Sequence, residues 1–146
     1  MNSDIIPGIT RSVSLQVNER LLVTAFARDF PAFADLPPVF ATAFMVGFME
    51  WACIEALQPW LPDGETTVGT HVYLSHVAPT PKGMKVTAHV ELIEVKGRTL
   101  RFRVDCFDVC GLIGSGFHER TVVDSARFMA KVAEKVAHGA RALAAA

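Results

Sequence analysis

The first clear pattern in the chain is an alternation of apolar and polar residues. From Ile9 to Val17, aliphatic side chains occupy most odd positions, and hydroxyl or amide side chains occupy the even ones. This period of two predicts a half-buried strand. Asn18 follows as a candidate N-cap, and a short helix is expected in residues 19–27, ERLLVTAFA. The stretch 29–40 holds three prolines, each without a backbone donor, which indicates either a packed connector or a lid.

A long apolar segment, Val39–Leu57, comes next and is expected to be a helix. Its residues are apolar on every side, so the helix should be buried on every side. Pro59 and Pro62 follow it closely and prevent it from continuing.

Four strands and a helix are expected after this segment. The first strand covers Thr67–Val77 and the last covers Ile113–Val123. Two alternating stretches lie between them, with inner faces formed by Met84, Val86, Ala88, Val90 and Leu92 and by Leu100, Phe102, Val104 and Cys106. Lys96–Gly97 and Cys110–Gly111 fit hairpin turns. An amphipathic helix then runs from a Ser125 cap to Gly139, with one side formed by Phe128, Val132 and Val136.

This order of elements predicts an α+β fold in a single domain, residues 1–146. One antiparallel sheet wraps around one long central helix, with a lid segment and a C-terminal helix, which is the hotdog pattern. A single sheet covers only one side of that helix. Cover for the other side must come from the lid, a partner subunit or both, and a homodimer built by pairing two sheets is expected.

Composition narrows the class of protein. The chain has 146 residues, 51% of them hydrophobic, and a net charge of -1, so it lacks the basic surface of a nucleic-acid-binding protein. Three cysteines with no zinc-site spacing favour a reducing compartment. The N-terminal stretch MNSDIIPGITRS does not resemble a signal peptide, and no apolar run reaches the ~20 residues that span a bilayer. We therefore expect a cytoplasmic protein without membrane, metal or cofactor.

Glu50 is the one charged residue within the apolar stretch VFATAFMVGFMEWAC. Burying a lone ionised carboxylate is costly, so Glu50 must be paired, protonated or used in chemistry. None of its helical neighbours can pair with it. The alternative is that Glu50 lies on a small exposed stripe of the helix. Glu55 lies roughly 140° away from it around the axis and suits an exposed position better.

Thr42 and His76 are the next candidates. Thr42 lies in the first turn of the same helix, where a hydroxyl either caps the helix or bonds a substrate. His76 shares strand parity with Val68, Thr70, Val72 and Leu74, which predicts that it faces the core. It is either a satisfied core histidine or a partner of Glu50, because an imidazole and a carboxylate facing one pocket can share a proton.

Two further positions stand out in the strands. Gly69 is a strand glycine without a turn, which indicates either a β-bulge or close approach of a ligand to a free N–H. Arg120 and His118 share one parity in the last strand. Arg120 is a candidate phosphate clamp, with an ordinary surface arginine as the alternative. His71 has the opposite parity to His76 and is expected on the surface.

Three stretches together, VFATAFMVGFMEWAC, GTHVYLSHVAPTP and GSGFHERTVV, resemble the fluoroacetyl-CoA thioesterases, a hotdog-fold branch of the acyl-CoA thioesterases. The resemblance covers about Phe33 to Lys131. It implies that Thr42 is the hydroxyl residue that acts at the thioester, Glu50 the catalytic carboxylate and His76 the catalytic histidine.

The resemblance also implies a substrate-binding set. Gly69 corresponds to the glycine whose backbone holds the acyl group, and Arg120 to the arginine near the fluorinated acyl end. Phe33, Leu36 and Val39 correspond to the lid. Leu36 is a departure, because the fluoroacetyl-selective enzyme has a phenylalanine there that gates the acyl pocket. The departure bears on the choice of acyl group and leaves the catalytic trio intact.

The expected function is hydrolysis of a short-chain acyl-CoA, with fluoroacetyl-CoA as the family's characteristic substrate. Gly69 N–H and the Thr42 hydroxyl would stabilise the oxyanion, Glu50 would attack or activate water, and His76 would shuttle the proton. Two alternatives stay open. One is a hotdog hydratase or dehydratase acting on an acyl thioester, and the other is a non-catalytic acyl-CoA-binding module.

Overall fold

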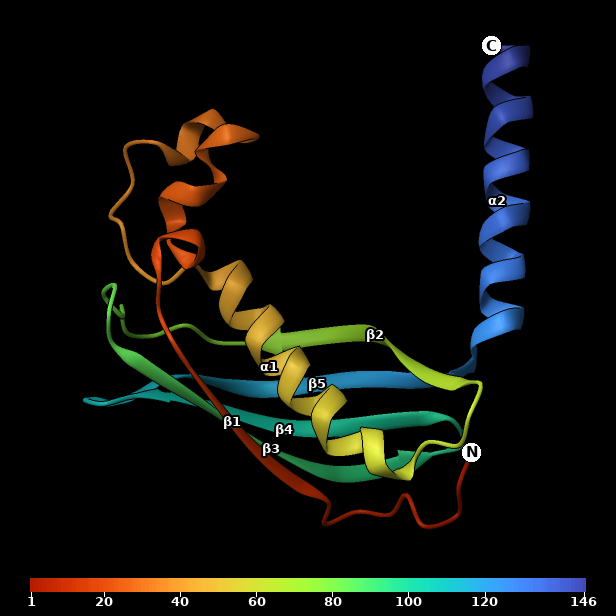
Figure 1. The fold of residues 1–146 in the computed structure, drawn as a ribbon, viewed down its shortest axis with the longest axis horizontal. Helices are drawn as coiled ribbons and strands as arrows, with labels where there is room; N and C mark the ends of the chain where they lie inside the picture. Colours follow the sequence, from red (N-terminus) through yellow and green to blue (C-terminus); the bar gives the residue numbers. More distant parts are fainter.

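A single five-stranded antiparallel sheet forms the body of the molecule (Figure 1). The computed structural model describes residues 1–146. The strands run in the order β1-β3-β4-β5-β2 across the sheet, so β1 and β2 form its two edges. Their bounds are β1 (Thr10–Gln16), β2 (Glu65–Leu74), β3 (Lys85–Lys96), β4 (Thr99–Asp108) and β5 (Gly111–Asp124).

The alternation in β3 and β4 produces the core as expected. The inner residues of the two strands have no exposed surface: Val86, Ala88, Val90, Leu92, Leu100, Phe102, Val104 and Cys106. The hairpin turns fall beside the predicted positions, and Gly97 and Gly111 adopt φ values of 58° and 146° that side chains disfavour. The predicted hotdog architecture, a curled antiparallel sheet with a central helix, is confirmed.

Helix α1 (Thr42–Leu57) lies across one face of the sheet (Figure 1). It begins later than predicted because Val39 and Phe40 form isolated β-bridges instead. One side of α1 packs on the sheet, but Trp51 and Ile54 on the other side are 41% and 42% exposed. The expectation of burial on every side is therefore wrong within one chain, since a single sheet covers only one side.

The N-terminal connection consists of short 3₁₀ turns rather than one short helix. These are η1 (Glu19–Leu21), η2 (Val23–Arg28) and η3 (Pro31–Phe33), and a fourth, η4 (Gln58–Trp60), follows α1. The predicted cap is confirmed, because the Asn18 side chain accepts a hydrogen bond from the backbone N–H of Arg20 at 3.0 Å.

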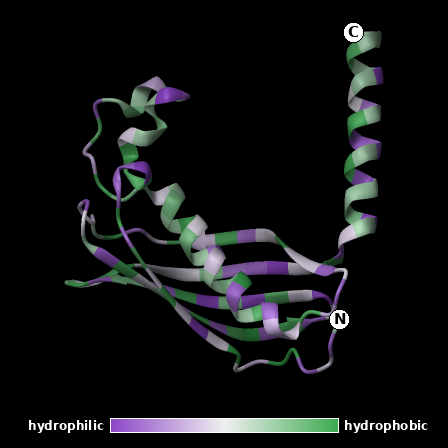
Figure 2. Ribbon diagram, viewed as in Figure 1, coloured by the Kyte–Doolittle hydropathy of each residue, from purple (hydrophilic) through white to green (hydrophobic).

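Helix α2 (Ser125–Ala145) stands away from the sheet (Figure 1). Two sequence predictions about it are wrong. Asp124, rather than Ser125, caps the helix by accepting the Arg127 N–H at 2.8 Å, and the helix continues through Gly139. Figure 2 shows apolar and polar bands alternating along it, and the expected apolar side formed by Phe128, Val132 and Val136 is exposed. No helix in the chain is both long and apolar enough to span a membrane.

Candidate active site

Thr42 and His76 meet at the beginning of α1. Thr42 is the first residue of the helix, and His76 follows the end of β2. Thr42 Oγ1 lies 2.7 Å from His76 Nδ1, so the hydroxyl bonds the imidazole rather than capping the helix. His76 Nε2 is buried without a hydrogen-bond partner. Burial lowers the pKa of His76, which keeps the ring neutral near neutral pH.

A hollow of about 310 Å³ adjoins this pair. It brings Val39 of the lid segment together with Thr42 and His76, and the remaining lining residues are Val23, Phe40, Val77, Ala78 and Pro79. The backbone N–H groups of the first helical turn lie at the same end of α1, where the helix dipole favours negative charge. The arrangement suits a small, polarised group beside a neutral histidine.

Glu50 is paired, and its partner comes from β5. Arg120 Nη1 donates to Glu50 Oε1 at 2.7 Å. The Arg120 side chain is 4% exposed and that of Glu50 is 36% exposed. Arg120 also donates from Nε to Thr67 Oγ1 at 2.8 Å and from Nη2 to the Thr67 carbonyl at 2.9 Å. It is therefore not an ordinary surface arginine, and it presents no exposed guanidinium to a phosphate.

His118 completes the surroundings of Arg120. Its Nδ1 lies 2.8 Å from the His71 carbonyl, to which it donates, so Nε2 accepts from Arg120 Nη1 at 3.2 Å. Burial is the main cause that lowers the pKa of His118. His71 itself is on the surface as expected and pairs with Glu119 at 3.0 Å. Sequence reasoning noted only the parity of His118, and it missed Thr67, whose signal was its position two residues before Gly69.

Gly69 is both a bulge residue and a site of close approach. The β2–β5 register shifts between Gly69 and His71, so Thr70 is the extra residue. Gly69 pairs with Arg120, and Val72 pairs with His118. The predicted common face of Val68, Thr70, Val72, Leu74 and His76 is therefore wrong, because the bulge reverses parity within β2. A Cβ atom at Gly69 would lie 2.7 Å from Glu50 Oε1, so any larger residue there would force the carboxylate to move.

The candidate residues thus form two groups along α1. Thr42 bonds His76, whereas Glu50 bonds Arg120, and no hydrogen bond joins the two groups. Eight residues separate Thr42 from Glu50, or ~12 Å along the helix axis. The thiol of Cys53 lies near the second group, and burial raises its pKa to about 12, so it is not a ready nucleophile.

The lid residues are placed differently from one another. Phe33 belongs to an aromatic cluster in which Phe26 stacks on Phe44 of α1 at 4.9 Å and contacts Phe33 at 5.4 Å between ring centroids. This cluster attaches the 3₁₀ turns to the beginning of α1. Leu36 follows Phe33 in the chain and is 45% exposed.

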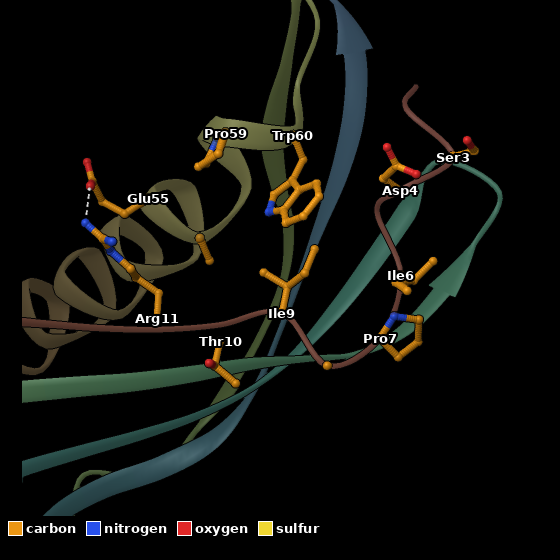
Figure 3. Close-up of a pocket in the computed structure, with 12 residues that line it drawn as sticks. Ser3, Asp4, Ile6, Pro7, Ile9, Thr10, Arg11, Glu55, Pro59 and Trp60 are labelled. Carbon is orange, nitrogen blue, oxygen red and sulfur yellow. Dashed lines mark hydrogen bonds and ion pairs between the residues drawn. The ribbon is translucent and has the colours of Figure 1, made fainter.

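A larger hollow, about 700 Å³, lies elsewhere (Figure 3). It is formed by the N-terminal segment, β1 and the C-terminal end of α1. Trp60 lines it, as do Arg11 and Glu55, which pair at 3.3 Å. None of the predicted site residues lines this hollow, so size alone does not locate the site.

Known structures first define the class of protein. A thioesterase superfamily member of Thermus thermophilus superposes with a TM-score of 0.84 at 26% identity, covering 96% of this chain and 98% of that chain. A solved structure of the fluoroacetyl-CoA thioesterase FlK gives a TM-score of 0.88 at 42% identity, covering 91% of this chain and 98% of that chain. The fold is thus that of the hotdog thioesterases.

Sequence comparison then gives the family. The fluoroacetyl-CoA thioesterase of Streptantibioticus cattleyicolor is 50% identical over 111 residues, which cover 76% of this chain and 80% of that protein. The model of the FlK family, described as fluoroacetyl-CoA-specific thioesterase, matches residues 22–126. The chain belongs to the family of fluoroacetyl-CoA-specific thioesterases, which confirms the resemblance seen in the sequence.

Proposed function

We propose that this protein hydrolyses a short-chain acyl-CoA to the free acid and CoA, with fluoroacetyl-CoA as a leading candidate substrate. The observation that carries the proposal is the Thr42–His76 contact of 2.7 Å beside a hollow of about 310 Å³. That volume is sufficient for a short acyl group. The solved FlK structures include one with fluoroacetate and CoA, which supports the same substrate class here.

In the proposed mechanism, α1 and β2 supply the polar groups. The candidate oxyanion donors are the Gly69 N–H, which lies beside Glu50, and the Thr42 hydroxyl, which bonds His76. Because these two groups lie ~12 Å apart along α1 of one chain, each proposed site combines one group from each subunit of the homodimer inferred below. Glu50 either attacks the carbonyl carbon itself or activates the attacking water. If Glu50 attacks, the C–S bond breaks to leave an anhydride between the acyl group and Glu50, which water then hydrolyses to the free acid. If Glu50 acts as a base, hydroxide adds to the carbonyl carbon and the C–S bond then breaks. On either route His76 passes one proton of the consumed water to the thiolate of CoA.

Release of free thiol from a panel of acyl-CoA esters tests this proposal. The panel contains acetyl-, fluoroacetyl-, longer-chain, phenylacetyl- and crotonyl-CoA. We expect the highest kcat/KM on a short-chain ester. Hydration of crotonyl-CoA without free CoA would instead indicate a hydratase, and binding without any thiol release would indicate a non-catalytic module.

We propose that the lid determines the choice between acetyl- and fluoroacetyl-CoA. Leu36 stands where the fluoroacetyl-selective enzyme has a phenylalanine, and leucine lacks the quadrupole of an aromatic ring. Val39 lines the hollow beside Thr42, and Phe33 anchors the lid through the aromatic cluster. Equal kcat/KM values on acetyl- and fluoroacetyl-CoA would exclude selectivity for fluorine.

We infer that the chain forms a homodimer. Trp51 and Ile54 leave an apolar side of α1 exposed, and β2 is an open sheet edge. Sedimentation velocity tests this, with Tyr73→Lys on β2 and Val109→Lys in the β4–β5 turn as a matched control, since the two side chains are 78% and 70% exposed. We expect a dimer that only Tyr73→Lys weakens, whereas a monomeric wild type would contradict the inference.

We further infer one hotdog domain over residues 1–146, located in the cytoplasm. Packing of α1 against β1, β2, β3 and β4 supports the single domain. Limited proteolysis that splits the sheet into two stable fragments would contradict it. Three free cysteines support a reducing compartment, and cell fractionation tests the location.

A further inference from the structure

We infer that Thr67 and His118 are positioning residues, which hold the Arg120 guanidinium so that its Nη1 points at Glu50. The inference rests on the proposed role of Glu50 in thioester hydrolysis. Thr67 and His118 come from β2 and β5, and both residues are buried and bonded to Arg120. Neither residue belongs to the set of catalytic and substrate-binding residues proposed above.

The hydrogen bonds of Arg120 fix the plane of its guanidinium. Thr67 accepts twice, at its hydroxyl from Nε and at its carbonyl from Nη2. These two bonds lie on one edge of the planar group and determine its orientation, as a bidentate contact does. Nη1 on the other side is then directed to Glu50 Oε1 at 2.7 Å and to His118 Nε2 at 3.2 Å.

His118 can accept this bond only in one tautomer. Its Nδ1–H donates to the His71 carbonyl, which leaves the lone pair of Nε2 facing Arg120. The charged groups around it are Arg120 and Glu119 on its own strand and Glu50 on α1. A protonated His118 would set an N–H of Nε2 against an N–H of Arg120 and break the bond. Burial lowers the pKa of His118 and so favours the neutral form.

The contrast in burial indicates a functional role for this network. Thr67, His118 and Arg120 are 9%, 2% and 3% exposed, whereas the Glu50 side chain is 36% exposed. The network is therefore buried and hydrogen-bonded at one end, and its last member, Glu50, is accessible to a substrate. Gly69 keeps the space above the carboxylate open, since a Cβ atom there would lie 2.7 Å from Oε1. Small errors in the placement of a reacting group have large effects on rate.

Two pairs of variants separate positioning from packing. Thr67→Val removes the hydroxyl but keeps the shape, and Thr67→Ser restores it. His118→Asn keeps a donor near the Nδ1 position, and His118→Gln keeps an acceptor near the Nε2 position. Thiol release gives kcat and KM for each variant on the best acyl-CoA, and thermal unfolding reports the folded fraction.

We expect Thr67→Val and His118→Asn to lower kcat about tenfold with little change in KM, because each removes a hydrogen bond to a charged group. Thr67→Ser and His118→Gln should stay within about threefold of wild type. Wild-type kcat in both Thr67→Val and His118→Asn would overturn the inference. An equal loss in all four folded variants would also overturn it, because the effect would then be one of packing.

A second measurement does not depend on activity. In ¹⁵N spectra of the wild type, the Arg120 Nε–H should exchange slowly with solvent, and His118 should show the neutral Nδ1–H tautomer. Rapid exchange of Nε–H or the other tautomer would overturn the inference even if a variant fails to fold. A wild type that hydrolyses no acyl-CoA would instead refute the proposed function and leave the spectra to test the network.

Discussion

Replacement of Gly69 by alanine tests whether the position of the Glu50 carboxylate controls turnover. A Cβ atom at Gly69 would lie 2.7 Å from Glu50 Oε1, and ordinary contact begins at 3.4 Å, so the carboxylate must move by 3.4 − 2.7 = 0.7 Å. The flexible glutamate can make this movement, and Gly69 has no positive φ, so the backbone accepts alanine. The movement takes Oε1 away from Arg120 Nη1, now 2.7 Å distant.

We expect the Gly69→Ala substitution to lower kcat strongly and the free energy of unfolding only slightly. Glu50 is partly exposed, so weakening its ion pair costs about 1 kcal/mol or less. Alanine offsets about 0.4–1 kcal/mol of that by restricting the unfolded chain. A displacement approaching 1 Å can lower a rate by up to about 100-fold, and we expect kcat to fall about 10- to 100-fold. Thiol release measures kcat, and thermal unfolding measures stability.

Gly139→Ala is the matched control. Gly139 lies within α2, and a Cβ atom there would meet nothing within 4 Å. Its kcat should equal that of wild type, and α2 should gain up to about 1 kcal/mol. A Gly69→Ala protein with wild-type kcat and normal stability would refute the reasoning, because the carboxylate would then be elsewhere or would not matter.

Three further predictions concern pH, the lid and α2. Because burial lowers the pKa of His76 below its ordinary 6.5, the unfolded chain takes up this proton first, so stability should fall as pH drops through that value. Protonation of His76 should lower kcat/KM only below pH 6.5. A fall in kcat/KM that begins above pH 6.5 as the solution is acidified would contradict the role of His76. Leu36→Phe should raise the fluoroacetyl to acetyl ratio of kcat/KM about tenfold, and an unchanged ratio would exclude the lid as selector. Asp124→Ala should weaken the first turn of α2 by about 1 kcal/mol in hydrogen exchange, whereas an equal effect of Ser125→Ala would contradict the observed cap.

The local pattern of the sequence was sufficient for the strands that carry the core. In β3 and β4 the alternating residues are regular and fully buried, so parity and burial agree. In β2 the extra residue Thr70 reverses parity, and composition gives only a weak sign of it in Gly69. A bulge depends on the partner strand as well as on the chain that contains it, so parity cannot be carried across it.

Tertiary contacts limited the prediction of the site. The Glu50 carboxylate was identified as anomalous, but its partner Arg120 lies 70 residues away and could not be found among helical neighbours. Thr67 carried no signal beyond its position two residues before Gly69, which places the two residues on one face of the strand. Gly139 does not end α2, because one glycine costs a helix only about 1 kcal/mol. The exposed side of α1 likewise depends on a covering surface that local sequence patterns do not describe.

The proposed chemistry depends most directly on Glu50. Glu50→Gln keeps the size of the side chain and an oxygen that can still accept from Arg120, but removes the nucleophile or base. The decisive measurement is the rate of CoA release by this variant on the best short-chain acyl-CoA, with thermal unfolding as a check of folding. We predict that nearly all turnover is lost in a folded protein, and a variant that keeps most of the wild-type rate would contradict the mechanism.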